Sequence, residues 1–515
     1  MKPLDFTKPT KIQLSIDNQL IDCDIKNDIA TFKDVKVGFS ESKYGADLMV
    51  DAKESLISHV YLIYEFPLDE DVLVMGDVIE RGYGDLSWSK PNPDRQMFWY
   101  FYCYKELSKQ LYACGVGVQP HSIVSFYLKD NTLLVDVNVQ SGGSGVNLQG
   151  RTLLAATFIE HNYLDGDVFD NCRDFLKRLM MDIKAKPLKE SVYGFNNWYY
   201  AYGNSSYQEI VGDTCLLEEL TKECQIRPFM VIDDGWSPYP CSGPWEANEK
   251  FIDMSKLCLE IKSHNIKPGL WIRPMMDSSD VLSNHRHPLQ KTLLDPTSKE
   301  VKEHVFNVLK KVTSWGYQLI KFDYITYDIF LKYAFEMPKD LCEQGFRFED
   351  NHFTNAEIIL DLYKLIREAC GNAILIGCNT ISHLCAGIVE INRIGDDTSG
   401  LEWERTRKMG VNSLAFRLIQ NDIFYKIDAD CVGIAGKIEW KQNKEWLKLL
   451  AKSGSPLFVS CDPKVATEEI EKDLTEAFRI NEIQTDICRP VDWMKTVLPE
   501  EWLINEELVT FNWNI

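Results

Sequence analysis

The chain has few of the features that mark membrane proteins, disulfide-bonded proteins or metal proteins. No apolar run approaches the roughly 20 residues of a membrane-spanning helix, and residues 1–9 have no apolar signal-peptide core. The 15 cysteines show no C-x-x-C spacing, and the 9 histidines are dispersed. We therefore expect a cytoplasmic protein with buried free thiols, no metal, no organic cofactor and no membrane partner.

Positive charge is also scarce. The chain has 56 Lys and Arg residues against 77 Asp and Glu residues, which gives a formal net charge of −21. Such a charge argues against nucleic acid and anionic membranes as partners. Aromatic residues, by contrast, make up 12% of the chain. They suit sugar binding and the packing of β-sheets equally well, so both interpretations stay open.

The length of 515 residues is too great for a single hydrophobic core. Residues 1–185 alternate between apolar and polar positions with frequent turn signals, which predicts an antiparallel β-sandwich. The clearest strand-like runs are 11–16, 59–65, 97–103, 122–127 and 132–139. A helix over 172–183 is expected to end this domain.

Residues 186–481 change to a repeating order of strand, loop and helix. The expected strands are 192–198, 228–234, 267–273, 319–325, 373–378, 389–394, 424–429 and 456–461. Between them, 299–315 and 355–370 have clear helical periodicity. Thr354 or Asn355 is the expected N-cap of the second helix, and Gly371 its C-cap. Eight such units predict a (β/α)8 barrel.

Two parts of the chain depart from this regular order. Residues 379–388 between the fifth and sixth strands are too few for a regular helix. A helix over 466–480 is expected to close the barrel. The tail, 482–515, then contains short strand-like pieces. They predict a β segment that is either a small separate cap or a strand pair added to the sandwich.

Acidic residues gather where the expected barrel strands end. They are Asp233 and Asp234 at the end of the second strand, Asp323 at the end of the fourth, Asp396 and Asp397 after the sixth, and Asp428 and Asp430 at the end of the seventh. Lys321 lies two residues before Asp323, so both side chains point to one face of a strand. A hydrophobic core has no use for carboxylates, because an unpaired buried charge is costly. Carboxylates at a barrel mouth suit glycoside chemistry, which needs one ionised and one protonated carboxyl.

Each group also has a simpler interpretation. Asp233 and Asp234 could bind a divalent metal or close a turn, and Lys321 with Asp323 could form a structural ion pair. The pair Asp396–Asp397 could be the N-cap of a helix that starts near residue 399, and turn or supporting roles are favoured for the acidic residues of 428–430. The side chains of Trp198, Trp236 and Trp271 could all be packing, although we expect at least one to stack on a sugar ring.

Six motifs, taken in order, resemble glycoside hydrolase family 36 and its relatives in the α-galactosidase clan. They are N-N-W-Y at 196–199, D-D-G-W at 233–236, G-L-W at 269–271, K-F-D at 321–323, R-I-G-D-D at 393–397 and D-A-D-C at 428–431. The resemblance covers about residues 190–465. It implies a β-sandwich followed by a (β/α)8 barrel.

The resemblance also implies a role for each site residue. Asp323 would be the nucleophile and Asp397 the general acid/base of a retaining mechanism. Asp233 and Asp234 would bind the axial 4-hydroxyl and the 6-hydroxyl of a galactose-like ring. Lys321 would reach the 3- and 4-hydroxyls, and Arg393 the 2-position, with Trp198, Trp236 and Trp271 among the substrate-binding residues. Lys321 is expected to keep Asp323 ionised, and Asp396 to raise the pKa of Asp397.

Two positions depart from the family pattern. Arg273 precedes Pro274 where relatives commonly have an acidic residue, so it could bind a carboxylate or an altered substituent. The segment 377–383, which includes Cys378, replaces a glycine-rich segment beside the 2-substituent of the sugar. Galactose, N-acetylgalactosamine and a pentose therefore stay open.

The resemblance implies a retaining exo-α-glycosidase, most closely an α-galactosidase, that acts on a small oligosaccharide or glycoside. A raffinose-synthase-like galactosyltransferase and an α-N-acetylgalactosaminidase are the alternatives of the same chemistry. An α-glucosidase-like specificity and a sugar-binding protein without activity are the others. The oligomeric state stays open, with a homo-oligomer among the alternatives.

Overall fold

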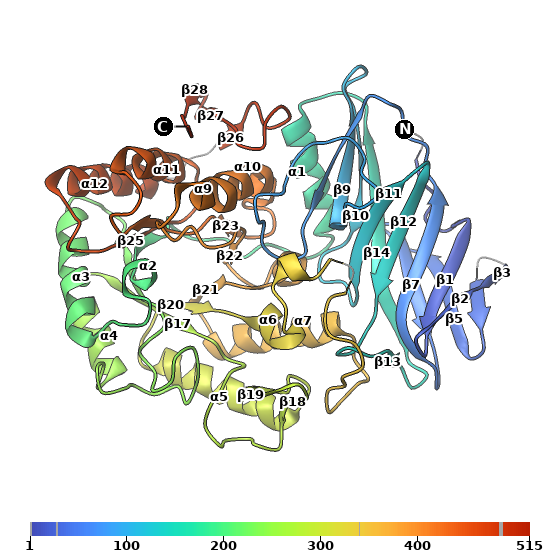
Figure 1. Ribbon diagram of the computed structural model, residues 1–515, viewed down its shortest axis with the longest axis horizontal. Helices are drawn as coiled ribbons and strands as arrows, with labels where there is room; N and C mark the ends of the chain where they lie inside the picture. Colours follow the sequence, from blue (N-terminus) through green and yellow to red (C-terminus); the bar gives the residue numbers. More distant parts are fainter. Residues whose placement is uncertain (1–2, 27–28, 339, 484–487, 515) are drawn as a thin grey trace.

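The computed structural model describes residues 3–26, 29–338, 340–483 and 488–514. It contains a large antiparallel sheet, a curled parallel sheet covered by helices, and a small sheet near the C-terminus (Figure 1). The antiparallel sheet comes first in the chain and lies beside the parallel one, and the small sheet lies above the helices of the chain's last third. The functional residues predicted above all belong to the parallel-sheet region.

Within the described residues, the antiparallel sheet has 14 strands. Their bounds are β1 Lys11–Ile16, β2 Gln19–Asp22, β3 Asp24–Lys26, β4 Ile29–Phe32, β5 Val35–Glu41, β6 Ala46–Asp51, β7 Leu56–Glu65, β8 Val72–Asp77, β9 Met97–Lys105, β10 Gln110–Val116, β11 Ile123–Lys129, β12 Thr132–Asn138, β13 Val146–Asn147 and β14 Thr152–Tyr163. Strands such as β1 alternate buried and partly buried residues, which explains why the period of two was visible in the sequence.

The antiparallel sheet folds over on itself. Its hydrogen-bonded order runs from β2 through β1, β7, β12, β11, β9, β10, β14, β6, β5 and β4 to β3. The two end strands, β2 and β3, are consecutive in the chain, so one segment spans both ends of the sheet. Phe66, after β7, packs on Tyr112 of β10 with ring centroids 5.3 Å apart, although other strands separate them in the sheet. The predicted antiparallel domain is therefore present as one continuous folded sheet.

The parallel sheet contains a strand inside each of the eight runs predicted from the sequence. Its strands are β15 Tyr193–Asn196, β16 Phe229–Ile232, β17 Lys267–Ile272, β20 Leu319–Phe322, β21 Ile374–Gly377, β22 Ile391–Arg393, β23 Lys426–Asp428, β24 Val432–Ile434 and β25 Leu457–Cys461. The sheet order ends on β23 and β24, which are consecutive in the chain. The sheet therefore curls until its two ends meet through residues 429–431, and Asp430 there has a positive φ of 75°.

Helices lie on the outer face of the parallel sheet (Figure 1). The α-helices of the described chain are α1 Val168–Leu179, α2 Trp198–Ala201, α3 Tyr207–Leu220, α4 Met254–Ser263, α5 Lys299–Ser314, α6 Ile325–Phe330, α7 Asn355–Cys370, α8 Ser382–Cys385, α9 Trp403–Arg405, α10 Ser413–Arg417, α11 Trp440–Lys452 and α12 Glu468–Glu482. Short 3-10 turns η1 Ala334–Glu336 and η3 Leu418–Gln420, a π-helical stretch η2 Thr406–Asn412, and a hairpin of β18 Arg286–His287 and β19 Gln290–Leu294 complete this part.

The helix boundaries follow capping chemistry. For α7, Thr354 accepts from the backbone N–H of Glu357, the Glu357 side chain returns to the Thr354 N–H, and Gly371 ends the helix as predicted. The prediction for α1 was wrong by four residues. The Asp167 side chain accepts from the N–H of Asp170, so the helix starts at Val168 instead of residue 172.

The region after β22 is less regular than a simple barrel unit. Glu402 precedes α9, and the chain continues through η2, α10 and η3. The expected alternative that Asp396 or Asp397 caps a helix is therefore wrong. In the preceding link, α8 has only 4 residues, which agrees with the prediction that residues 379–388 hold no regular helix.

The C-terminal residues form their own antiparallel sheet of β26 Cys488–Pro490, β27 Glu501–Ile504 and β28 Glu507–Thr510. This corresponds to the predicted small cap, although residues 484–487 and 515 of the predicted tail lie outside the described residues. Trp493 packs against Trp88 of the N-terminal region and Phe416 of α10. The cap therefore joins the two larger parts.

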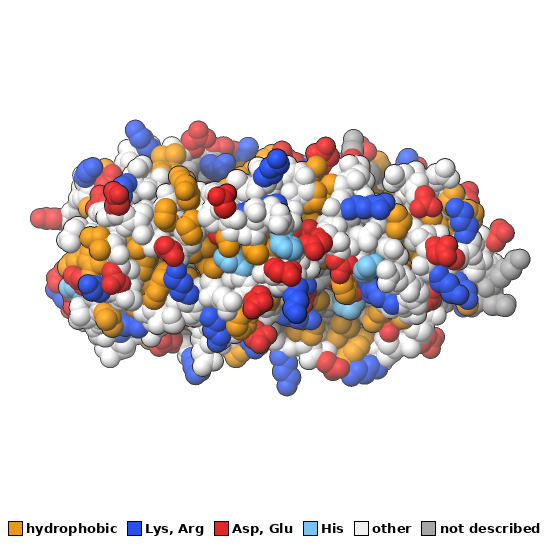
Figure 2. Space-filling model, turned by 90° about the horizontal axis from the view of Figure 1, so that it is seen from below, with side chains coloured by type: hydrophobic (Ala, Val, Ile, Leu, Met, Phe, Trp, Pro, Cys, Tyr) orange, Lys and Arg blue, Asp and Glu red, His pale blue; other side chains and the backbone are white. Residues whose placement is uncertain are grey.

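The sequence led to expectations about the cysteines, membrane-spanning helices and surface charge, and the structure bears on each. All 15 cysteines lie in the described residues and are free thiols, most of them buried. None of the described helices combines the length and the hydropathy of a membrane span. On the face drawn in Figure 2, acidic and basic side chains are interspersed with scattered hydrophobic ones.

Candidate active site

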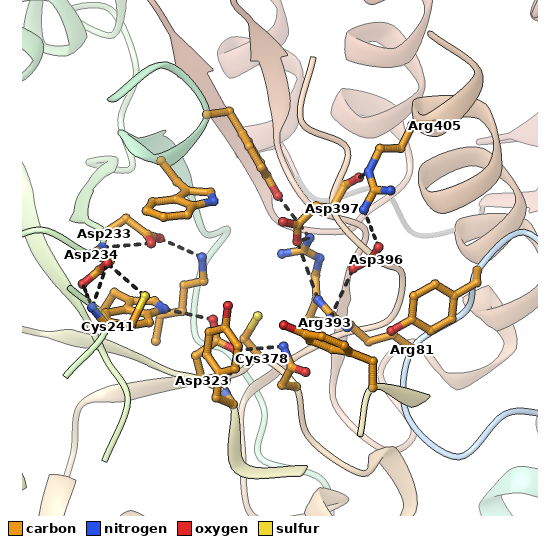
Figure 3. Close-up of a pocket in the computed structure, with 18 of the residues that line it drawn as sticks. Arg81, Asp233, Asp234, Cys241, Asp323, Cys378, Arg393, Asp396, Asp397 and Arg405 are labelled. Carbon is orange, nitrogen blue, oxygen red and sulfur yellow. Dashed lines mark hydrogen bonds and ion pairs between the residues drawn. The ribbon is translucent and has the colours of Figure 1, made fainter. Parts of the chain in front are cut away.

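A cavity of about 340 Å³ opens where strands of the parallel sheet end. Asp233 and Asp234 lie on one side of it, Asp396 and Asp397 on the other, and Asp323 between them at the lower edge of the view (Figure 3). The sheet thus gathers carboxylates that are up to 164 positions apart in the chain, as the strand-end pattern predicted.

One wall of the cavity is a buried ion pair. The Lys321 ammonium donates to Asp233 Oδ2 at 2.7 Å, and the Asn196 side-chain amide donates to the same oxygen at 2.8 Å. Burial lowers the pKa of Lys321, but Asp233, Cys378 and Asp323 more than offset it, so the pKa lies well above its ordinary value. The alternative that Lys321 and Asp323 form a structural ion pair is wrong, because the ammonium is paired with Asp233.

Asp234 is held by the loop that follows the strand. The backbone N–H of Cys241 donates to both Asp234 oxygens, at 3.0 and 3.1 Å, and the Cys241 thiol donates to Oδ2 at 3.1 Å. Burial raises the pKa of Asp234, and the bonds from Cys241 oppose that rise. The turn needs Gly235, since it has φ 110° and a Cβ there would lie 2.5 Å from the carbonyl oxygen of Gly203.

Asp323 lies just after β20 and is only 7% exposed. Trp271 Nε1 donates to its Oδ2 at 3.0 Å. Asn379 Nδ2 and the Tyr324 N–H donate to Oδ1, at 3.0 and 2.7 Å. Three donors on one carboxylate fix its orientation toward the cavity. Trp271 therefore serves Asp323 through its ring nitrogen.

Asp397 lies among arginines. Arg393 donates to its Oδ1 at 3.1 Å, and Arg81 lies 3.6 Å from the same atom. Burial raises the pKa of Asp397, but Arg393, Arg81 and Lys321 outweigh it, so the pKa lies below its ordinary value. The side chain is still 39% exposed, so one part of the carboxyl faces the cavity.

Asp396 does not act on Asp397 as predicted. Its carboxylate is paired with Arg81 at 3.2 Å and with Arg405. Because two guanidinium groups neutralise Asp396, it has little charge left to raise the pKa of its neighbour. The expected rise in the pKa of Asp397 is therefore wrong for the free protein.

Asp428, the last residue of β23, and Asp430 just after it lie behind the cavity. Asp430 is 2.5 Å from Arg393 and accepts from the backbone N–H of Thr398 at 2.7 Å. Tyr199 also donates to Asp430. Asp430 thus holds Arg393 and the segment that carries Asp397, which agrees with the supporting role predicted for it. Asp428 in turn accepts from the Asp430 N–H.

The other predicted residues divide into two groups. Trp198, Trp271 and Cys378 line the cavity. Trp236 does not: it is fully buried, donates to the backbone oxygen of Trp271 at 3.0 Å and packs among other tryptophans. Arg273 also lies outside the cavity, because it forms a bidentate ion pair with the buried Asp328. The structure therefore does not place Trp236 and Arg273, two predicted substrate-binding residues, in the cavity wall.

Several residues of the cavity wall were not predicted. They are Arg81, Tyr83, Cys241, Tyr324, Tyr333, Phe335, Asn379 and Arg405. Tyr324 and Asn379 directly follow predicted strand-end residues, so the strand-end pattern could have found them. Arg81 and Tyr83 come from the antiparallel-sheet region. There, the Gly82 N–H donates to the carbonyl of Ile394 at 2.8 Å, and the Asp396 N–H donates to the carbonyl of Gly82 at 3.1 Å.

The sequence left open that Asp233 and Asp234 bind a divalent metal ion, and the surroundings of these two carboxylates bear on that alternative. Across the described chain, no group of three or more His, Cys, Asp or Glu residues is arranged to hold a metal ion. The cation beside Asp233 is the Lys321 ammonium, and both oxygens of Asp234 accept from Cys241. Donors of the protein itself therefore hold both carboxylates in place.

The arrangement combines two kinds of carboxyl in one cavity. Asp323 is held by three neutral hydrogen-bond donors. Asp397 is partly exposed, and the arginines beside it lower its pKa. Carboxyl groups in distinct surroundings facing one cavity suit nucleophilic attack and proton transfer at neighbouring atoms of a substrate.

Comparisons with known proteins bear on the fold of the chain. No protein-family model and no curated protein sequence matches the chain. Among solved structures, the α-galactosidase of Thermus thermophilus bound to p-nitrophenyl α-D-galactopyranoside is similar with a TM-score of 0.62 and 15% identity, over 97% of this chain and 99% of that one. A Geobacillus stearothermophilus family 36 α-galactosidase with 1-deoxygalactonojirimycin gives a TM-score of 0.61 and 11% identity, over 98% and 75%. At such identities the likeness establishes the fold.

Proposed function

We propose that this protein is a retaining exo-α-galactosidase that removes terminal α-galactosyl groups from small oligosaccharides. The observation that carries the proposal is the shared cavity of Asp323 and Asp397, bounded by the Lys321–Asp233 pair and by Asp234. The fold neighbours support it, since they are α-galactosidases, among them the Thermus thermophilus enzyme with stachyose and a Geobacillus stearothermophilus enzyme with raffinose.

The proposed reaction has two steps. Asp323 attacks the anomeric carbon while the protonated Asp397 gives its proton to the glycosidic oxygen, and the leaving group departs. Asp397, now ionised, takes a proton from water, which attacks the galactosyl–Asp323 ester and releases galactose with its configuration retained. Retention requires the two carboxyls to be about 5–5.5 Å apart in the complex. The arginines beside Asp397 favour its ionised state, which is the state that the second step needs.

The sugar would lie between the two sides of the cavity. The Lys321 ammonium and the Asp233 and Asp234 carboxylates offer one donor group and several acceptors, which suits neighbouring hydroxyls of a galactose-like ring. Trp198 lines the same space and offers a flat apolar surface to the C–H face of the ring. We assign the 2-substituent to the part of the cavity wall that Arg393 and Cys378 form.

We further propose the domain organisation that the sequence suggests: a β-sandwich over residues 1–185, a (β/α)8 barrel over 186–481 and a short β segment over 482–515. The curled parallel sheet supports the second assignment, since its end strands are joined by only three residues. The first assignment has a functional consequence, because Arg81 then enters the catalytic cavity from another domain.

The experiment that tests this function is hydrolysis of four 4-nitrophenyl α-glycosides: the galactoside, the N-acetylgalactosaminide, the arabinopyranoside and the glucoside. We expect the galactoside to have the highest kcat/KM and the glucoside, its 4-epimer, to react at least roughly 100-fold more slowly, because it leaves the buried Lys321–Asp233–Asp234 surface unpaired. Preference for the glucoside would contradict the proposal. Preference for the N-acetylgalactosaminide would change the 2-substituent of the proposed substrate from a hydroxyl to an acetamido group and leave the rest of the proposal in place.

A further inference from the structure

Five aromatic side chains form a row from the nucleophile to the mouth of the cavity. In order they are Tyr324, Tyr327, Tyr333, Phe335 and Tyr83, with consecutive ring centroids 6.1, 4.7, 5.9 and 5.1 Å apart. Tyr324 directly follows Asp323 in the chain. The rings of Tyr333 and Phe335 are nearly parallel, with an interplanar angle of 5°. This aromatic row joins the parallel-sheet region to the N-terminal region, which contributes Tyr83.

The outer end of the row is accessible. Phe335 is 59% exposed, and Tyr83, Tyr333 and Phe335 all line the cavity that contains Asp323 and Asp397. Packing in a core does not explain Phe335, since a core phenylalanine would be covered. Phe335 is not a lone exposed side chain, because it adjoins Tyr333 and Tyr83, and the three together give one wall of the cavity an aromatic surface.

The outer end also lies on the Asp397 side of the cavity. Gly82, between Arg81 and Tyr83, accepts from the backbone N–H of Asp396, and the Arg81 guanidinium pairs with the Asp396 carboxylate. Tyr83 is therefore tied to the segment that carries the proton donor. The opposite side of the cavity carries the charged groups of Asp233, Asp234 and Lys321.

These positions match the two halves of a glycoside. The polar side suits the hydroxyl groups of the sugar that is cleaved off, whereas Asp397 marks the glycosidic oxygen. Whatever is attached to that oxygen extends past Asp397. The C–H face of a pyranose ring is flat and apolar, so it packs well on aromatic rings.

We propose that Tyr83, Tyr333 and Phe335 bind the sugar ring of the leaving group, and that they favour substrates with a sugar leaving group over those whose leaving group is a small ion or an alkyl chain. This inference rests on the proposed function and deepens it. It assigns part of the substrate specificity to a residue of the N-terminal region, Tyr83.

The test compares two substrates with the same galactosyl group. Raffinose has a sugar as its leaving group, whereas α-galactosyl fluoride has only fluoride and cannot contact the aromatic row. We expect Phe335→Ala to lower the ratio of kcat/KM on raffinose to that on the fluoride by roughly 10-fold, as loss of partial burial of an aromatic face predicts. Phe335→Trp should restore most of the ratio.

Phe353→Ala is the matched control. Phe353 is also a largely exposed phenylalanine, at 44%, but it lines a different cavity beside α7. The ratio should stay within about twofold of the unmodified protein, as expected for a site remote from the reaction. Melting temperatures of all variants separate changes in folding from changes in specificity.

Three other outcomes would contradict the proposal that these aromatic residues bind the leaving-group sugar. An unchanged ratio in Phe335→Ala, or an equal loss on both substrates, would show that Phe335 does not bind the leaving-group sugar. Octyl α-galactoside is assayed as a third substrate, and a loss of kcat/KM on it but not on raffinose would assign the aromatic row to an alkyl group. If the unmodified protein hydrolyses neither raffinose nor the fluoride, the proposed function itself fails, and this inference with it.

Discussion

Replacing Asp323 with alanine should lower kcat/KM for 4-nitrophenyl α-galactoside by at least roughly 10⁴-fold, the scale seen when a nucleophile is removed. The structure gives the reason: Asp323 is the carboxylate that Trp271, Asn379 and the Tyr324 N–H hold in place toward the cavity. A steady-state assay of the purified variant measures the loss. A matched variant, Asp136→Ala on β12, removes a partly buried carboxylate of the antiparallel sheet and should retain nearly full activity.

Added azide distinguishes a missing nucleophile from a damaged fold. The alanine leaves space for a small anion on the side of the anomeric carbon that Asp323 occupied. We expect azide to restore part of the turnover of Asp323→Ala and to give β-galactosyl azide, because a single displacement inverts the configuration. Activity of the variant within tenfold of the unmodified protein would mean that another group attacks the substrate.

Replacing Asp397 with alanine should produce a loss that depends on the leaving group. On raffinose, whose leaving sugar needs a proton, we expect kcat/KM to fall by about 10²- to 10⁴-fold, the usual contribution of a general acid. On α-galactosyl fluoride the fall should be far smaller. Azide should speed up the second step, and here the product should be α-galactosyl azide, because Asp323 still forms the intermediate. A uniform loss on both substrates would contradict a proton-transfer role.

Arg81→Gln is the informative comparison for Asp397, because it retains the carboxyl and removes one cation near it. Since Asp397 must be protonated to act as an acid, kcat/KM on raffinose should fall as the pH rises through its lowered pKa. Loss of Arg81 raises the pKa of Asp397, so the alkaline limb of the pH profile of kcat/KM should move to higher pH. Arg81→Lys retains the charge and should leave the limb near its original position.

The strand-end carboxylates were predictable because of a simple geometric rule. Parallel strands that curl together place their carboxyl ends at one rim, so Asp233, Asp323 and Asp397 had to meet if the strands were assigned correctly. Helix α7 was predictable for a comparable reason, since its cap residues and its period are local. Strand ends, helix caps and helical periodicity can each be recognised from residues that are neighbours in the chain.

Pairings across the fold were not predictable in the same way. Lys321 lies two residues from Asp323, but the neighbouring strands bring Asp233 to its ammonium instead. Trp236 belongs to a motif of the site, yet the turn at Gly235 directs its ring into the core. Arg81 comes from another sheet altogether. These outcomes depend on distances between elements, which no local pattern contains.

The most direct test of the central claim is the configuration of the sugar first released by the unmodified protein. Proton NMR during hydrolysis of 4-nitrophenyl α-galactoside distinguishes α-galactose from β-galactose before the two anomers equilibrate. The proposed double displacement through Asp323 predicts that α-galactose appears first. If β-galactose appears first, water attacks the substrate directly, and the nucleophilic role of Asp323 is wrong. If no galactose is released, the cavity does not have the proposed activity.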